Sequence, residues 1–455
     1  MSLKSNITKA IRYLKKNGIR HTVYAGVERV FFPYYKDYTY LSPSKEELIK
    51  QRKTKFSQNR LFSIVVPTYE TKEAHLKEMI ESVLMQSYEN FELILADASQ
   101  SDTVEKVVKL YQDTRIVYKK LDENLGISDN TNVGICLAKG DYIGLLDHDD
   151  LLTYDALYEV MCKIEEEKKS GKDAMIIFSD EDKCNEDGSY FFEPHFKMDY
   201  NKELLFTNNY ICHFLVTKAE LMKELMLRQE FDGAQDFDFI LRATACINRQ
   251  ISEGKQVTIS HISKVLYHWR CHENSTAENP ESKMYAYEAG KRATCWAMKQ
   301  EGRNVEMTHE KHLGFYRAKV ETKENLFKEN KKLACIGGAI YQKGKIVGGA
   351  MTRDGEVTYA GLHKGFSGYM NRANLMQNAE ALDLRNIIVR EELQSVFEEI
   401  TQLPYVKKSQ KDNIFDYKKA LKEAGKKEPV DFPALSLVFC EKLKKMGYEI
   451  IYWET

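Results

Sequence analysis

The cluster Asp147-His148-Asp149-Asp150 follows an apolar segment, DYIGLL (141–146), and its residue types can bind a divalent cation. Alternate positions of an extended segment share one face, so Asp147 and Asp149 can point the same way. Two such carboxylates suit Mg²⁺ or Mn²⁺, which prefers oxygen ligands and binds together with substrate phosphates. The alternative is a helix cap, because acidic residues favour helix starts and LTYDALYEVM follows. We expect Asp147 and Asp149 to hold a metal and Asp150 to belong to that helix start.

Three more segments bring acids, bases or cations together: FDGAQDFD (231–238), LYHWRCHENSTA (266–277) and SDEDK (179–183). In the first, Asp236 and Asp238 point differently if they open a helix, and an acidic first turn is the structural alternative. The second contains His268, Arg270 and His272, where arginine suits a phosphate and histidine a metal. Its alternative is a structural His-Trp pair. The third either lines a sugar or acceptor pocket or forms a charged turn.

The elements that must position these residues alternate between strand and helix. Apolar strands are predicted at 62–69, 91–99, 115–121 and 141–147, and helices at 75–87, 103–113 and 127–138. This short-spaced alternation predicts a parallel sheet with crossover helices, in which ligands bind beyond the carboxyl ends of the strands. Polar loops follow those ends at 67–70, 97–99, 123–126 and 147–150. We therefore expect the four loops to converge on one edge.

The four segments FSIVVPTYE, ADASQSD, ENLGISDNTNVG and GDYIGLLDHDD, in this order, resemble the nucleotide-binding half of family 2 glycosyltransferases. The resemblance runs from about residue 60 to 318. SDEDK, EPHFK, NNYICH, FDGAQDFD and LYHWRCHENSTA resemble one bacterial branch of that family, associated with surface polysaccharides. The resemblance implies an α/β GT-A fold: a Rossmann-like nucleotide-binding sheet with an attached acceptor half, here followed by a smaller α+β region.

The resemblance also implies roles for the loops at that edge. Pro67, Thr68, Tyr69 and Glu70 match the segment that holds the base and ribose, and Asn124 and Gly126 match the loop near ribose and phosphates. Asp97 matches an acid that meets the pyrimidine, although Ala96 and Ala98 replace an acid and a glycine beside it. Asp147 and Asp149 match the two acids of the DxD motif. Of these two, we expect Asp149 to be the direct metal ligand and Asp147 to help bind donor and metal.

Three residues of the later segments take roles through the same resemblance. Asp236 matches the catalytic base, which takes the proton of the acceptor hydroxyl as its oxygen attacks the anomeric carbon. His268 is our choice for the histidine that completes the metal site, with His272 as the alternative. Arg270 is expected to offset the charge of the leaving nucleoside diphosphate.

The chain divides into three predicted parts. Residues 1–60 contain 14 Lys/Arg and 4 Asp/Glu, although the whole chain has a net charge of -1. We interpret 1–60 as a basic helical N-terminal extension, either in contact with anionic lipid or packed on the body. Residues 61–320 are the expected catalytic domain. Residues 333–455 repeat parts of it without a DxD motif, which suggests a degenerate, truncated transferase module.

The sequence therefore predicts an inverting, Mn²⁺- or Mg²⁺-dependent glycosyltransferase that moves a sugar from a nucleotide-sugar to a growing cell-surface glycan. Rhamnosyl, galactofuranosyl and hexosyl transfer all remain open, as do the acceptor, the linkage and the oligomeric state, including a homo-oligomer. The alternative is a non-catalytic nucleotide- or glycan-binding subunit of a polysaccharide synthase. The 9 scattered cysteines and the absence of an apolar leader predict a cytoplasmic protein, at most peripheral on the inner face of the membrane. Bulk charge gives no indication of nucleic-acid binding.

Overall fold

The computed structural model describes residues 3–272, 284–409, 412–426 and 430–454. The chain forms two compact units. The large-sheet unit comprises Tyr35–Tyr200 and Asn209–Ala297. The small-sheet unit comprises Met1–Tyr34, Asn201–Asn208 and Met298–Thr455. These boundaries differ from the predicted ranges 1–60, 61–320 and 333–455, because distant segments of the chain pack together in each unit.

The large-sheet unit begins with the predicted alternation of strands and helices. Its first elements are α2 (Lys45–Arg52), β1 (Phe62–Thr68), α3 (Glu73–Leu84), β2 (Phe91–Asp97), α4 (Thr103–Val108), β3 (Ile116–Lys120), α5 (Ile127–Leu137) and β4 (Tyr142–Leu145). Strands β3, β2, β1 and β4 lie side by side and run parallel. Their inward residues are fully buried, including Ile64, Val66 and Leu93. The predicted parallel sheet with crossover helices is confirmed.

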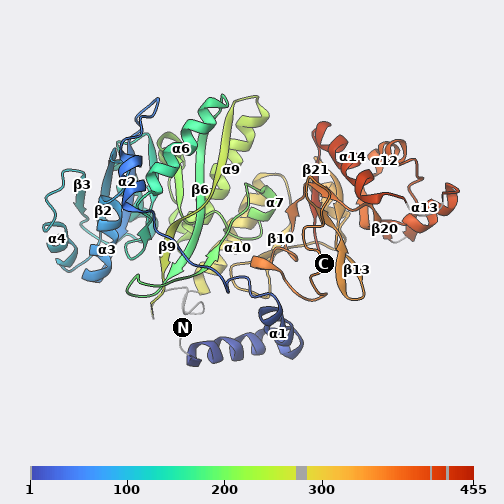
Figure 1. The fold of residues 1–455 in the computed structure, drawn as a ribbon, viewed down its shortest axis with the longest axis horizontal. Coiled ribbons are helices and arrows are strands. Elements are labelled where there is room, and N and C mark those ends of the chain that lie inside the picture. The colour runs from blue at the N-terminus through green and yellow to red at the C-terminus, as the bar shows by residue number, and fades with distance from the viewer. Residues whose placement is uncertain (1–2, 273–283, 410–411, 427–429, 455) are drawn as a thin grey trace. The chain divides into compact units, whose positions relative to one another are not determined.

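The second half of this unit extends the same sheet. It contains β5 (Leu151–Leu152), α6 (Ala156–Lys169), β6 (Asp173–Cys184), β7 (Phe191–His195), β8 (Leu215–Lys218), α8 (Ala219–Leu225), the short helix η1 (Gln229–Phe231), α9 (Gln235–Ser252), β9 (Val257–Arg270) and α10 (Met284–Gln300). Strand β8 joins β4 in antiparallel fashion, and the order continues β8-β6-β9-β5 with β7 on β6. Figure 1 shows α6 and α9 alongside the long strands β6 and β9. The α/β fold class with an attached second half is confirmed.

The small-sheet unit is built around a four-stranded sheet of order β16-β21-β12-β18. Its elements are α1 (Leu3–Phe31), α7 (Lys202–Leu205), β10 (Glu306–His309), β11 (Tyr316–Lys319), α11 (Asn325–Glu329), β12 (Leu333–Gly337), β13 (Ile340–Gln342), β14 (Lys345–Gly348), β15 (Ala350–Met351), η3 (Tyr369–Asn371), β16 (Gln377–Asn378), β17 (Ala381–Leu382), η4 (Leu384–Asn386), β18 (Ile387–Val389), η5 (Glu391–Leu393), α12 (Gln394–Thr401), β19 (Lys407–Ser409), β20 (Asp412–Phe415), α13 (Tyr417–Glu423), α14 (Phe432–Lys445) and β21 (Glu449–Tyr452). Strands and helices are mixed here, as expected for a smaller α+β region. Its origin as a degenerate transferase module stays a prediction.

Helix α1 belongs to this second unit and is not a separate extension. The buried Glu28 accepts hydrogen bonds from the backbone N–H groups of Ser367 (2.9 Å) and Gly368 (2.7 Å). Tyr24 packs edge-on against Phe366. The predicted helix at the N-terminus is therefore confirmed, but one face of it is packed on the region that the sequence assigned to 333–455.

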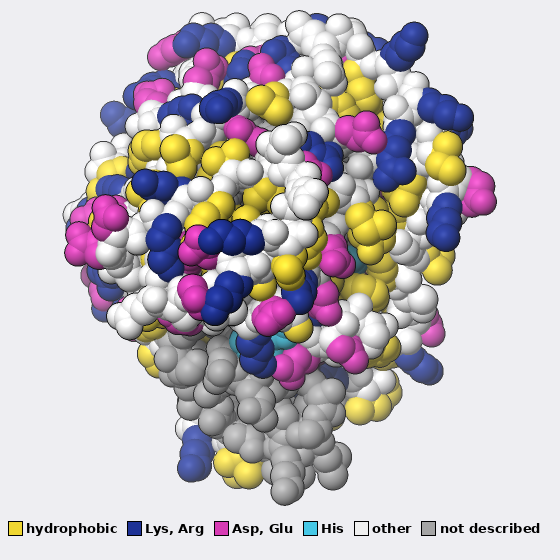
Figure 2. Space-filling model, turned by 90° about the vertical axis from the view of Figure 1, so that its left-hand side faces the viewer, with side chains coloured by type: hydrophobic (Ala, Val, Ile, Leu, Met, Phe, Trp, Pro, Cys, Tyr) yellow, Lys and Arg dark blue, Asp and Glu magenta, His cyan; other side chains and the backbone are white. Residues whose placement is uncertain are grey.

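Charges of both signs are mixed on one face of the protein. Figure 2 shows Lys and Arg side chains interspersed with Asp and Glu on one face. That face has no continuous basic stripe of the kind that binds nucleic acid.

Candidate active site

The end of β2 is organised around Asp97, which is fully buried. Its carboxylate accepts hydrogen bonds from the hydroxyl of Thr68 (3.3 Å), the N–H of Ser99 (2.9 Å), the hydroxyl of Tyr118 (2.7 Å) and the ammonium of Lys120 (3.1 Å). Burial alone would raise the pKa of Asp97, but these bonds outweigh it and lower the pKa. The acid expected to meet a pyrimidine therefore also ties three strands together at this edge.

The loop after β1 is fastened to the loop after β2 by Glu70. Its carboxylate accepts from the hydroxyl of Ser101 (2.7 Å) and from the N–H groups of Gln100 (2.7 Å) and Ser101 (3.0 Å), which lowers its pKa. Tyr69, between Glu70 and the strand that contains Pro67, has 47% of its surface exposed. Its ring is therefore available to a flat ligand, whereas Glu70 is engaged in shaping the loop.

The loop before α5 contains Asn124 and Gly126. The Asn124 side-chain oxygen accepts from the N–H of Gly126 (3.1 Å) and from the amide of Asn130 (2.8 Å). Gly126 has a φ of +97°, and a Cβ atom there would lie 2.6 Å from a carboxylate oxygen of Asp232. Asp232 in turn accepts from the N–H of Ser128 at 3.3 Å. A glycine is needed here for both reasons, and the part that Asp232 plays could not be predicted from local sequence.

The DHDD segment separates into three differently placed carboxylates. His272 Nε2 lies 2.8 Å from Asp149 Oδ2. Burial would raise the pKa of Asp149, but this bond and the charge of His148 lower it to about 2. The Asp147 side chain is 48% exposed, with its Oδ2 at 3.9 Å from His213 Nε2. Burial raises the pKa of Asp147, in contrast to that of Asp149. The two carboxylates therefore lie beside different imidazoles, Asp147 beside His213 and Asp149 beside His272.

Asp150 does not begin the following helix, which corrects the expectation from the sequence. Helix α6 starts at Ala156, and the preceding residue is Asp155. Asp150 is buried and accepts from the hydroxyl of Tyr267 (2.5 Å) and from the N–H of Arg270 (2.7 Å). Burial and the charges of its acidic neighbours raise its pKa well above the usual value. Its partners come from β9, more than a hundred residues away, and local sequence could not reveal them.

The structure places His272, not His268, next to the acidic cluster. His268 lies opposite Asp182 in the register of β9 and β6, and their side chains are 2.5 Å apart. The His268 ring is buried between the rings of Tyr40 (4.4 Å) and Phe191 (4.2 Å). His272 lies beyond the end of β9 and reaches Asp149 instead. His272, the alternative that the sequence left open, is therefore the histidine beside Asp149, while its role as a metal ligand stays a prediction. Residues 273–277 of the same segment lie outside the described residues.

Arg270 is fully buried, which corrects its expected role as a phosphate contact. Its guanidinium donates to the backbone carbonyls of Asp149 (2.5 Å) and Glu186 (2.6 Å) and pairs with the carboxylate of Glu78 (2.7 Å). Two nitrogens of the guanidinium are thus hydrogen-bonded within the protein, and the third lies in an ion pair with Glu78. Arg270 fixes the loop that presents Asp149.

Asp236 lies in the first turn of α9 and receives a hydrogen bond from the side-chain amide of Asn209 at 2.8 Å. Ligating atoms of Asp236, His213 and Cys212 all lie within 4.8 Å of one another. Asp238 points elsewhere, as expected for a helix start: it is buried and ion-paired with Arg242 at 2.9 Å and with Arg228. Asp236 is therefore the acid of this pair that faces the DHDD side of the sheet.

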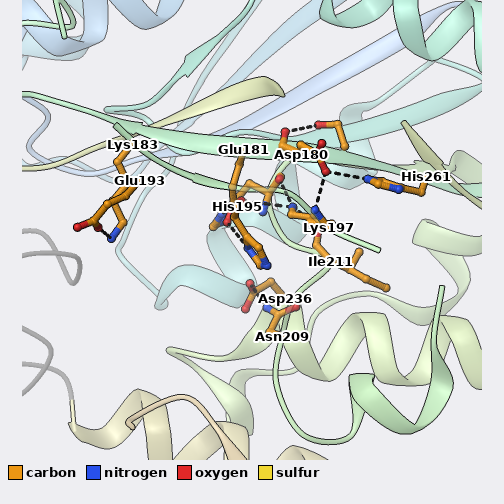
Figure 3. A network of polar contacts seen from close by, with 12 residues as sticks. Asp180, Glu181, Lys183, Glu193, His195, Lys197, Asn209, Ile211, Asp236 and His261 are labelled. Atoms are coloured by element: carbon orange, nitrogen blue, oxygen red, sulfur yellow. Dashed lines mark hydrogen bonds and ion pairs between the residues drawn. The ribbon is translucent and has the colours of Figure 1, made fainter. Parts of the chain in front are cut away.

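The SDEDK segment is a buried polar network in β6, so a charged turn is the wrong interpretation. Asp180 binds His261 (2.8 Å) and the N–H of Lys197 (2.7 Å). Glu181 lies 3.3 Å from His195 and 3.4 Å from the Lys197 ammonium, and these bonds and charges hold its pKa well below the usual value despite burial. Figure 3 shows this network directly beside Asp236 and Asn209.

Comparison with known proteins assigns the part of the chain that contains these loops. Residues 63–230 match the sequence model described as "Glycosyl transferase family 2". This part of the chain is therefore similar in sequence to family 2 glycosyl transferases. The "Uncharacterized protein y4gI" of Sinorhizobium fredii is 46% identical over 237 residues, which cover 51% of this chain and 25% of that protein.

Two further relatives carry more informative names. The "O-antigen biosynthesis protein RfbC" of Myxococcus xanthus is 29% identical over 270 residues, covering 58% of this chain and 20% of the relative. The "Uncharacterized glycosyltransferase MJ1057" of Methanocaldococcus jannaschii is 31% identical over 192 residues, which cover 41% of this chain and 65% of that protein. The chain spans only a quarter or less of the length of the first two relatives.

The contacts of Arg270 generate a testable prediction. Arg270→Gln should leave two buried carbonyls without their donor and lower the free energy of unfolding by about 3 kcal/mol. Chemical denaturation of the full chain measures this change. The matched control is Arg249→Gln on the exposed side of α9, which should change the free energy by less than about 0.5 kcal/mol. Equal stability of Arg270→Gln and the wild type would contradict the role of Arg270 in fixing the Asp149 loop.

Proposed function

We propose that the protein is an inverting, metal-dependent glycosyltransferase that uses a nucleotide-sugar donor. One observation carries this proposal: Asp147 of the DHDD segment and Asp236 lie next to the same imidazole, that of His213. A transfer reaction of this kind needs carboxylates that hold a metal ion near the donor phosphates, and a base near the acceptor hydroxyl. The loop after β4 supplies the carboxylates for the metal, and the first turn of α9 supplies Asp236 as the base.

The residues around Asp149 fit a hard divalent cation. Asp149 and Asp147 offer carboxylate oxygens and His272 offers a nitrogen, which suits Mn²⁺ or Mg²⁺ bound together with a diphosphate. When bound, such an ion offsets the negative charge that develops on the leaving nucleoside diphosphate. Arg270 contributes indirectly, because it holds the Asp149 backbone.

Asp236 is the proposed base. Asn209 donates to one of its carboxylate oxygens, which orients the group and leaves the other oxygen to accept the proton of an acceptor hydroxyl. The deprotonated oxygen then attacks the anomeric carbon from the side opposite the diphosphate, which inverts that centre. Pro67, Thr68, Tyr69, Asp97, Asn124 and Gly126 remain the proposed nucleoside side of the site.

The acceptor is proposed to be a growing cell-surface glycan. The name of the Myxococcus relative refers to O-antigen biosynthesis, and the sequence resembles a branch associated with surface polysaccharides. Such glycans are commonly built on lipid carriers, which would bring the enzyme to a membrane surface. The donor sugar stays open between rhamnosyl, galactofuranosyl and hexosyl groups.

The outer face of α1 supports a peripheral membrane contact. Ile19, Val23, Val27 and Val30 recur at helical spacing and have 73%, 53%, 37% and 76% of their surfaces exposed. The exposed charges beside them, including Arg20 and Arg29, are basic, whereas the acid Glu28 is buried. An apolar stripe flanked by cations suits an anionic lipid surface. Among the described residues, no helix combines the length and apolar character needed to span a bilayer.

Asp236→Asn should lower the transfer rate by about 10²–10⁴-fold, because the amide cannot take the acceptor proton. Donor binding should persist, measured as the thermal shift that nucleotide-sugar and Mn²⁺ produce together. Asp354→Asn, an exposed turn residue of the small-sheet unit, is the control and should transfer normally. Wild-type turnover in Asp236→Asn would refute the base assignment. Absence of both donor hydrolysis and transfer in the wild type would favour a non-catalytic subunit.

Variants of His268 and His272 should differ in the Mn²⁺ concentration that activity requires. His272→Ala should raise the Mn²⁺ concentration for half-maximal activity at least about ten-fold, since it removes the partner of Asp149. His268→Ala should lower the Tm by breaking the buried contact with Asp182, with the Mn²⁺ requirement unchanged. Metal titrations of activity and thermal melts measure both. The reverse pattern would restore His268 as the ligand.

Membrane contact through α1 can be measured by co-sedimentation with vesicles. The wild type should bind vesicles containing phosphatidylglycerol more tightly than pure phosphatidylcholine vesicles, and less tightly at high salt. The double variant Val23→Asp with Val30→Asp should bind at least about ten-fold more weakly. Val438→Asp is the control, because Val438 is an exposed apolar residue of α14, at 54%. Equal loss in the control would exclude a specific role for α1.

A further inference from the structure

We propose that Cys212, His213 and Asp236 form a second cation site, selective for a soft or borderline metal such as Zn²⁺. Cys212 and His213 lie in the loop shortly before β8, and Asp236 lies in the first turn of α9. Their ligating sulfur, nitrogen and oxygen atoms lie within 4.8 Å of one another. Neither the family match nor the names of the relatives refers to such a site.

The three ligands are held in place before any ion binds. The His213 ring stacks on Tyr267, with centroids 4.9 Å apart and planes 19° from parallel. The His213 backbone is fixed on both sides, since its N–H donates to Glu181 and its carbonyl accepts from the buried Lys197 ammonium. Cys212 is only 8% exposed. Little conformational freedom therefore remains to be lost when a metal binds.

An unsatisfied nitrogen provides an independent indication of a ligand. His213 Nδ1 is buried and has no hydrogen-bond partner within the described part of the chain, and the closest carboxylate oxygen, from Glu181, is 3.6 Å away. Buried polar atoms are almost always satisfied by protein, water or an ion. The side-chain oxygen of Asn209, next to Asp236, is buried and unsatisfied in the same sense.

The chemistry of the donor set selects the ion. Thiolate, imidazole and carboxylate together suit Zn²⁺, whereas Mg²⁺ and Mn²⁺ prefer oxygen. Zinc bonds of about 2.0–2.3 Å place tetrahedral ligands roughly 3.5 Å apart. The site therefore has to close by about 1 Å, which rotation of the Asp236 carboxylate can provide. Three protein ligands leave a fourth position for water.

The site predicts a regulatory effect that rests on the proposed function. A metal bound here occupies the carboxylate of Asp236, so the group can no longer accept a proton. Zn²⁺ should therefore inhibit transfer even when Mn²⁺ saturates the site at Asp149 and His272. Binding itself does not depend on the transferase proposal.

Cobalt titration of the full chain tests binding directly, because a cobalt–thiolate bond produces a near-ultraviolet charge-transfer band. The wild type should bind one Co²⁺ with this band, and Zn²⁺ should displace it. Cys212→Ser should abolish the band, and Asp236→Asn should weaken Co²⁺ binding at least ten-fold. The matched control is Cys246→Ser, a partly exposed thiol on α9, which should retain the band. A band that survives Cys212→Ser, or is lost equally in Cys246→Ser, would overturn the site.

An activity measurement separates this inference from the proposed function. At saturating Mn²⁺, adding Zn²⁺ should lower the transfer rate of the wild type at least about ten-fold. The same addition should lower the rate of Cys212→Ser much less. Binding of Co²⁺ through Cys212 without any transferase activity would keep the site and refute the function. Transfer that depends on Asp236 without the cobalt band would keep the function and refute the site.

Discussion

The buried guanidinium of Arg270 is the interaction on which the candidate active site depends. It joins the end of β9 to the backbone of Asp149, to the carbonyl of Glu186 and to the carboxylate of Glu78. A buried guanidinium without partners is very costly, so the fold has to bring all three groups to it. The same contacts determine where the Asp149 carboxylate emerges. The contacts of Arg270 that stabilise the loop therefore also fix the position of the Asp149 carboxylate.

A second layer of buried charge supports the opposite side of the site. Three consecutive acids of β6 each have a cationic or imidazole partner: Asp180 binds His261, Glu181 binds Lys197 and His195, and Asp182 binds His268. Neighbouring residues of a strand point to opposite faces of the sheet, so these three acids bind side chains on both faces. On one of them, Glu181 and Lys197 hold the backbone of His213 beside Asp147 and Asp236.

Two kinds of donor atoms are thus separated within a small region. A carboxylate oxygen of Asp149 lies beside the His272 imidazole, and a thiol, an imidazole and a carboxylate gather at Cys212, His213 and Asp236. Because ligand softness governs which ion prefers which set of ligands, the two proposed sites need not compete for the same metal. His213 lies beside both Asp147 of the DHDD segment and Asp236 of α9.

The sequence by itself determined the α/β sheet with its parallel strands, because apolar periodicity is a local property. The roles of Asp147, Asp149 and Asp236 follow from the resemblance to a family and stay predictions. The sequence could not decide among the residues of YHWRCH. His268 was preferred, but the register of β9 against β6 places it opposite Asp182, and only beyond the strand end can His272 reach Asp149. Arg270 and Asp150 likewise owe their partners to strand pairing across more than a hundred residues. The packing of α1 through Glu28 was also decided by tertiary contacts, since a basic helix has the same sequence pattern whether its inner face is packed or free.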